Sequence, residues 1–244
     1  MSALALGAAQ APDCVLSARG VAKACGDRDV LDGLDFAVAR GECVALFGAS
    51  GAGKSLLLRL LLGLERPDAG QASVHVRTGV VFEQNALFED RSVEDNVALA
   101  LGAVAKRPAA AMRRAVHESL VLVGLKHVEH LRPGALPVGA RRRVALARAI
   151  VHEPERLLVD EPAAGLDPIA GAAILEVIAQ LRTRLDLAVL VATRDPERAL
   201  AIADRAAFLH GGRIAAEGPP AALRSHAHVA LQQLLTARPH GPIA

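Results

Sequence analysis

The sequence predicts an α/β domain with a mostly parallel sheet. Short apolar runs bounded by Gly, Asp or Pro alternate with stretches of helical periodicity, which is the pattern of strands joined by helices. The 244 residues suffice for one large domain, and a hydrophobic content of 52% is ample for a buried core. We therefore expect a single domain over 13–236, between a disordered leader at 1–12 and a flexible tail at 237–244.

The apolar runs and the helical periodicity place the individual elements. Strands are predicted at 34–39, 43–47, 79–83, 156–160, 187–193 and 206–210. Helices are predicted at 54–63, 108–123, 140–152, 168–185 and 196–203. Residues 92–135 show no strand pattern, and Ser92 with Asp95 resembles a capping box that opens a helix. The stretch 86–135 is therefore expected to form an inserted helical subdomain.

Composition and charge exclude several classes of protein. A net charge of +2, with arginines spread along the chain, leaves no basic stripe for nucleic acid. The longest apolar runs, at 97–105 and 187–193, fall far short of the roughly 20 residues that cross a bilayer. Direct membrane insertion is thus not expected, and a membrane role requires a partner chain. The cysteines lack metal-binding spacing and favour a reducing cytosol. They are Cys14, Cys25 and Cys43.

The segment GASGAGKS at 48–55 is the sharpest chemical signal. It follows the predicted strand 43–47 and opens the predicted helix 54–63, the context that a phosphate-binding loop needs. Its glycines let backbone N–H groups close around phosphate oxygens, and the helix N-terminus adds partial positive charge. Lys54 is expected to reach the β and γ phosphates of ATP, and the Ser55 hydroxyl to bind Mg²⁺; the alternative is a glycine-rich turn. The predicted nucleotide contacts are Gly48, Ala49, Ser50, Gly51, Ala52, Gly53, Lys54 and Ser55.

The predicted strand 156–160 ends in a pair of acids, Asp160 and Glu161. A carboxylate at the carboxyl end of a strand can face the phosphate loop on a neighbouring strand and hold Mg²⁺ through water. We assign that role to Asp160 and expect Glu161 to orient or deprotonate the attacking water, because phosphoryl transfer depends mainly on positioning and charge stabilisation.

Three segments together resemble the ATP-binding cassettes of ABC transporters, a family of P-loop ATPases. They are LPVGARRRVALARAI (136–150), RLLVDEPAAGLDP (156–168) and VATRDPERALAIADRAAFLHGGRI (191–214). The resemblance spans 16–235 and implies a peripheral subunit at the cytoplasmic face of the inner (plasma) membrane, attached through a permease. It also implies that two cassettes, identical or different, pack head to tail around ATP. Gly139 in the signature segment and Asp167 would then contribute to the nucleotide site between the two cassettes, with Asp167 at the dimer contact.

Within that family, two segments are similar to the lipid-trafficking cassettes of the Mla/Mce type. They are GVVFEQNALFEDRSVEDNVAL (79–99) and GLDPI (165–169). This similarity implies transport of a phospholipid- or sterol-type lipid. Importer cassettes for glutamine, methionine or other small solutes share much of the pattern and remain the alternative.

Several positions depart from the family pattern. Cys25 stands where the family places an aromatic ring against adenine. Pro137 and Val138 replace a Ser and a Gly of the signature, which removes a hydroxyl and adds a side chain. Glu83, followed by Gln84, stands at the Gln position, and Arg194 stands at the switch His. A short stretch at 64–78 also implies a reduced antiparallel side sheet.

The charges of Glu83 and Arg194 offset each other, so the summed charge near the phosphate is unchanged from the family pattern. Glu83 would join Ser55 and Asp160 as a Mg²⁺ ligand, and Arg194 would contact the γ-phosphate as an arginine finger in cis. The alternative is neutral drift in a slow cassette.

Two hypotheses about activity follow. The leading one is an ATP-hydrolysing transporter subunit in which Glu161, Glu83 and Arg194 act on the γ-phosphate. Its rival is a non-hydrolysing or slow ATP-binding cassette that regulates or completes an asymmetric pair, which Pro137, Val138 and Arg194 favour. A soluble cassette of repair or translation is disfavoured, because those proteins carry two cassettes or long coiled inserts.

Overall fold

The computed structural model describes residues 14–73, 77–102, 108–238 and 240–243, so the leader predicted at 1–12 lies outside the described residues. The chain divides into two compact units. Unit 1 comprises Met1–Val76 and Ala188–Ala244, and unit 2 comprises Arg77–Leu187. The single domain predicted over 13–236 stays a prediction.

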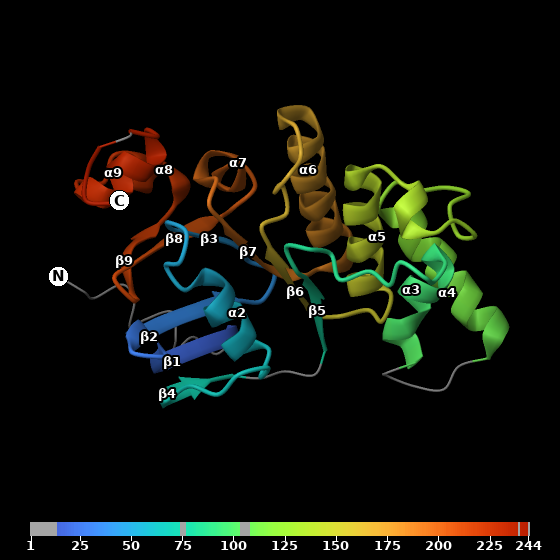
Figure 1. Cartoon of the computed structure of the whole chain (residues 1–244), viewed down its shortest axis with the longest axis horizontal. Helices are drawn as coiled ribbons and strands as arrows, with labels where there is room; N and C mark the ends of the chain where they lie inside the picture. Colours follow the sequence, from blue (N-terminus) through green and yellow to red (C-terminus); the bar gives the residue numbers. More distant parts are fainter. Residues whose placement is uncertain (1–13, 74–76, 103–107, 239, 244) are drawn as a thin grey trace. The chain divides into compact units, whose positions relative to one another are not determined.

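The core of unit 1 is a run of strands that confirms the predicted mostly parallel α/β architecture (Figure 1). Its order is β7-β3-β8-β9, in which β3 is parallel to β7 and β8 while β9 is antiparallel to β8. The strands are β3 (Cys43–Phe47), β7 (Ala188–Thr193), β8 (Arg205–His210) and β9 (Arg213–Gly218). Every residue of β3 and β7 is buried, as expected of parallel strands covered on both faces.

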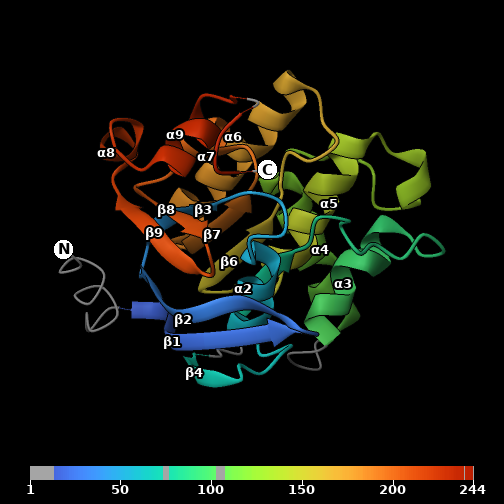
Figure 2. The same cartoon turned by 60° about the vertical axis from the view of Figure 1, so that its left-hand side comes forward.

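A small antiparallel sheet, ordered β2-β1-β4, completes the strands of unit 1 and confirms the small side sheet. It contains β1 (Cys14–Cys25), β2 (Arg28–Ala39) and β4 (Ala69–Ala72). Helix α2 (Lys54–Leu61) packs against β1 of this sheet and against β7 (Figure 2).

Sequence patterns missed most of the small sheet. The predicted strand 34–39 covers only the end of β2, and β1 and β4 were not predicted. Register shifts along β1 break its period-two alternation, and Gly33 in β2 has a φ of 62°, so both strands carry irregularities that hide them. The short strand β4 is exposed and gives no apolar signal.

The helices of unit 1 are short. Helix α7 (Pro196–Leu200) ends before the predicted limit of 196–203, and α8 (Pro220–Arg224) and α9 (Val229–Leu235) were not predicted. Within the tail predicted as flexible, Ile243 pairs with Gln233 of α9. The Gln233 amide donates to the Ile243 carbonyl and accepts from the Ile243 N–H, each at 2.8 Å.

Unit 2 is built around helix α5 (Val138–Ile150), which begins two residues before the predicted helix 140–152. It contacts β5 (Thr78–Val81) and the other long helices of the unit (Figure 1). Those helices are α3 (Val93–Gly102), α4 (Ala109–Leu122) and α6 (Pro168–Leu185). A 3-10 turn, η1 (Pro133–Ala135), precedes α5. Strand β5 is parallel to β6 (Arg156–Asp160), with Val81 opposite Val159.

The start of α3 is fixed by polar side chains, as the capping box predicts. The Ser92 hydroxyl accepts from the Asp95 N–H at 3.0 Å and donates to the Asp95 carboxylate at 2.6 Å. Asn96, fully buried, accepts from the Phe88 N–H at 2.8 Å and donates to the carbonyls of Phe88 and Ser92. These bonds hold the loop ahead of α3 and leave the Phe88 side chain half exposed.

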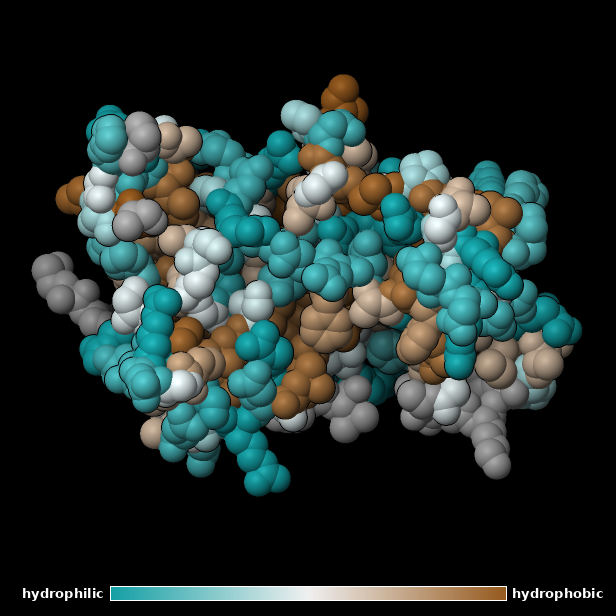
Figure 3. All heavy atoms as spheres, viewed as in Figure 1, coloured by the Kyte–Doolittle hydropathy of each residue, from teal (hydrophilic) through white to brown (hydrophobic). Residues whose placement is uncertain are grey.

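The apolar side chains on the surface of the described residues are scattered. Among the described residues, no helix is both long and apolar enough to cross a membrane. On the face shown in Figure 3, apolar residues form separate patches among polar ones. The large apolar side chains that stand exposed in the described part of the chain are Leu64, Phe88, Val121, Val138, Ile169 and Val229.

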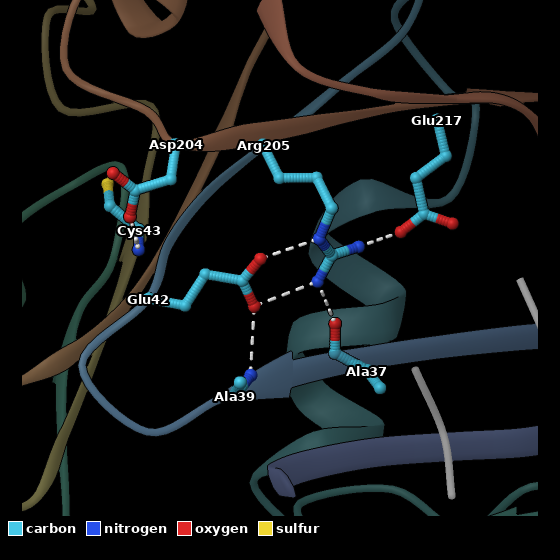
Figure 4. A network of polar contacts seen from close by, with 7 residues as sticks. All are labelled: Ala37, Ala39, Glu42, Cys43, Asp204, Arg205 and Glu217. Carbon is cyan, nitrogen blue, oxygen red and sulfur yellow. Dashed lines mark hydrogen bonds and ion pairs between the residues drawn. The ribbon is translucent and has the colours of Figure 1, made fainter. Parts of the chain in front are cut away.

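A network around Arg205 of β8 ties three strands of unit 1 and the turn into β3 together (Figure 4). Its guanidinium donates to both carboxylate oxygens of Glu42, at 2.6 and 3.0 Å, and to the Ala37 carbonyl at 2.6 Å. It also pairs with Glu217 of β9. Glu42 accepts from the Ala39 N–H at 2.9 Å, so one partly buried cation joins β8, β9, the end of β2 and the turn into β3.

We predict that Arg205→Met lowers the free energy of unfolding by about 1.5 to 3 kcal/mol, because two carboxylates and a carbonyl lose a charged partner. The matched control is Arg213→Met, which removes the exposed ion pair with Asp32 at 2.7 Å and should cost about 0.2 to 1 kcal/mol. Urea unfolding followed by circular dichroism measures both changes. Equal losses in the two variants would contradict a structural role for the Arg205 network.

Candidate functional site

The phosphate loop of unit 1 turns directly from β3 into α2, as predicted. A Cβ at Gly48 would clash with the Leu209 carbonyl of the neighbouring strand β8. Gly53, with a φ of 105°, caps α2, and a Cβ there would lie 2.9 Å from a methyl group of Leu31. The turn therefore requires glycine at both positions.

Lys54, the first residue of α2, folds back over this loop. Only 5% of the residue is exposed, and its Nζ donates to the carbonyls of Gly48 and Ala49 at 2.8 and 2.9 Å. Ser55 follows it in the first turn of the helix. An ammonium group held beside backbone N–H groups at a helix N-terminus makes an anion site suited to the phosphates of a nucleotide.

Arg194 follows strand β7 at the same edge of the sheet from which the phosphate loop follows β3. Strand β7 pairs with β3 so that Thr193 lies opposite Phe47, and each strand continues directly into its functional segment. Arg194 is exposed, while Thr193 is buried and its hydroxyl accepts from the Asp195 N–H at 3.0 Å. Arg194 and the phosphate loop therefore follow two adjacent parallel strands, at the same edge of the sheet in unit 1.

A cation that the sequence reasoning missed also lies near the loop. Arg28 begins β2, just after the exposed Cys25 at the expected aromatic position. One guanidinium nitrogen of Arg28 lies 4.0 Å from the point where a Cβ at Gly51 would sit. The only signal for it in the sequence is its closeness to Cys25.

The predicted acids lie at one edge of unit 2. Strands β5 and β6 run parallel and end together, so the loop with Glu83 and the loop with Glu161 leave the same edge. Asp160 and Glu161 are 6% and 7% exposed, whereas Glu83 is exposed. Glu161 has a φ of 47°, an uncommon conformation for a residue with a side chain and one found often at functional sites.

The signature segment begins α5. Pro137 is its N-cap and contributes no side-chain hydrogen bond, and Val138 is the first helical residue with 43% exposure. A Cβ at Gly139 would meet nothing within 4 Å, so this glycine is not required by packing inside the chain. Its expected role toward a second cassette stays a prediction.

Asp167 serves as the N-cap of α6. Its carboxylate accepts from the N–H groups of Ile169 and Ala170, both at 2.9 Å, and Pro168 occupies the first helical position. Asp167 is exposed, and its predicted place at a dimer contact is not tested by this local role.

The predicted Mg²⁺ ligands come from both units. Ser55 belongs to unit 1, and Asp160 and Glu83 belong to unit 2. Within the described residues, no group of three or more His, Cys, Asp or Glu side chains is arranged to hold a metal.

Comparison with known proteins agrees with this geometry. Residues 31–164 match the family model described as ABC transporter. An aliphatic sulfonates import ATP-binding protein of Rhodococcus jostii is 40% identical over 83% of this chain and 74% of its own. The intermembrane phospholipid transport system ATP-binding protein of Escherichia coli is 35% identical over 89% of this chain and 87% of its own.

A solved structure shares the fold. The cbiO1 protein of Clostridium perfringens, described as part of the ABC transporter complex cbiONQ, superposes with a TM-score of 0.79. It is 26% identical and covers 93% of this chain and 96% of its own. The glycine-dependent phosphate loop, the acids at the end of β6 and these matches together show that the chain belongs to the ABC transporter family, as an ATP-binding subunit.

Proposed function

We propose that this ABC-type ATPase subunit binds MgATP and hydrolyses it to power the transport of a phospholipid- or sterol-type lipid through a membrane permease. Lys54 and the backbone of the phosphate loop hold the phosphates. Ser55, Asp160 and Glu83 supply the oxygen ligands for Mg²⁺, and the Glu161 carboxylate orients or deprotonates the attacking water.

The observation that carries this proposal is the phosphate loop. Lys54 is held against the carbonyls of Gly48 and Ala49, at the N-terminus of a helix that follows a buried parallel strand. A strand, a glycine-dependent turn and an ammonium group at a helix start are the parts that hold a nucleotide triphosphate.

The lipid cargo is supported by the 35% identity to the phospholipid transport protein of E. coli and by the segment at 79–99. A second candidate, the import of a small anionic solute, is favoured by the 40% identity to the sulfonate import protein. For either cargo we propose that the chain lies at the cytoplasmic face of a membrane, attached through its permease. Neither needs a nucleic acid.

A tagged chain purified with its permease in mild detergent separates the two cargoes. We predict that phospholipid vesicles raise the ATPase rate of the complex severalfold, while an aliphatic sulfonate leaves it unchanged, because only a lipid would load the permease. The complex with Lys54→Ala is the control for background hydrolysis. Stimulation by the sulfonate and none by lipid would favour the importer.

A second cassette, identical or different, is the other proposed partner. Val138 and Ile169 are 43% and 83% exposed, and they stand beside Gly139 and Asp167, the residues that the family resemblance places at the dimer contact. Exposed apolar side chains next to these positions support a protein contact there.

Glu83 and Arg194, which stand where the family has a Gln and a His, are the residues on which an active and a degenerate cassette would differ. Arg194 follows β7 beside the phosphate loop in unit 1, and Glu83 follows β5 in unit 2. We propose that their opposite charges compensate each other at the γ-phosphate. The rival, a slow or non-hydrolysing cassette, is supported by Pro137, which offers neither hydroxyl nor N–H at the signature.

A double-mutant cycle tests the compensation. Glu83→Gln alone should slow product release, because Arg194 then binds ATP and product more tightly, and Arg194→His alone should weaken ATP binding. The double variant should recover much of both losses, with a coupling of about 1 to 3 kcal/mol. Steady-state ATPase rates and ATP affinities measure the cycle. Additive effects, with each reversion neutral or stimulating, would support drift instead.

A further inference from the structure

Arg142 of helix α5 makes contacts that the role of the signature segment does not explain. Only 2% of the residue is exposed. Its Nη1 donates to the carbonyls of Phe82 and Glu83, at 3.2 and 2.6 Å, and its Nη2 donates to the carbonyl of Ala164 at 3.2 Å. One buried guanidinium therefore bonds two backbone segments far apart in the sequence.

Both segments belong to the proposed hydrolytic site. The first follows β5 and carries Glu83, and the second follows β6 and Glu161. Because β5 and β6 are parallel and end together, the two loops leave one edge of unit 2. Arg142 spans that edge by bonding to carbonyls on each side.

The charge of Arg142 also matters at this edge. Burial lowers the pKa of Arg142, and the carboxylates of Glu83, Asp160 and Glu161 act on it in the opposite direction. These three acids are the ones assigned to the metal and the attacking water. A buried cation needs such negatively charged partners.

We propose that Arg142 is a positioning residue for ATP hydrolysis, which fixes the Glu83 loop against the loop after Glu161 and offsets part of the negative charge of the three acids. The proposal rests on the proposed function, since it concerns the same acids. Gly139, on the same helix, is assigned to the partner's nucleotide, whereas Arg142 serves the acids of its own chain.

A second arginine on α5 provides a matched control. Arg148 donates to the carbonyls of Asn85 and Ala86, both at 2.6 Å, and so holds the next part of the same loop. Burial lowers the pKa of Arg148 too, but no carboxylate is among the causes. Arg148→Gln therefore removes carbonyl bonds from the same helix to the same loop without removing charge from among the acids.

The test measures ATP affinity by isothermal titration calorimetry, once with excess Mg²⁺ and once with EDTA. In Arg142→Gln the acids repel free ATP more strongly and attract Mg²⁺ more strongly, so the ratio of the two affinities should rise about threefold to tenfold. Arg142→Lys keeps the charge and should keep the parental ratio. It cannot bond both loops, so its ATPase rate should fall at least about tenfold. Arg148→Gln should leave the ratio unchanged.

The outcomes separate this inference from the proposed function. If Arg142→Gln keeps the parental ratio, or if Arg148→Gln raises it equally, Arg142 is only a packing residue and the inference is overturned. Full ATPase activity in Arg142→Lys would overturn the bridging role. If the parent chain binds no ATP under either condition, the proposed function fails and the inference fails with it.

Discussion

The passage from β3 into α2 depends on a backbone without side chains at Gly48 and Gly53. The first lies against the Leu209 carbonyl, and the second takes a conformation that side chains disfavour. Because the chain can turn tightly there, a short loop joins the buried strand β3 to α2, and Lys54 and Ser55 are the first residues of that helix. The anion site, the position of Lys54 and the adjacency of Arg194 on β7 all follow from that turn.

Helix α5 has the corresponding role in unit 2. It contacts β5 and the helices on either side of it, and its arginines hold the loop after β5 by four carbonyls. The family signature is altered at Pro137 and Val138, at the exposed start of the helix. Farther along the helix lie Arg142, which is buried, and Arg148, which is partly buried. Helix α5 thus has an exposed start at Val138 and a buried part beside the strand end where Asp160 and Glu161 are buried.

The sequence predicted elements whose signals are local. Strand β3 reads as a continuous apolar run, and α6 has Asp167 as its cap, Pro168 at its start and ends at Leu185 as predicted. Strand β1 was missed because bulges break its alternation. In the site, the phosphate loop and the acids at the end of β6 are visible in the sequence as short motifs. Arg142 is not, because its partners lie 59 or 60 residues before it and 22 after it, and only folding brings them together.

Phosphate release from MgATP tests the account most directly, measured side by side for the parent chain and two variants in the complex with its permease. We expect the parent to release phosphate and Lys54→Ala and Glu161→Gln to lose that release. Glu161→Gln should still gain thermal stability from MgATP, whereas Lys54→Ala should not. Undiminished phosphate release by Lys54→Ala, or none by the parent, would contradict the claim that this cassette binds and hydrolyses ATP at its phosphate loop.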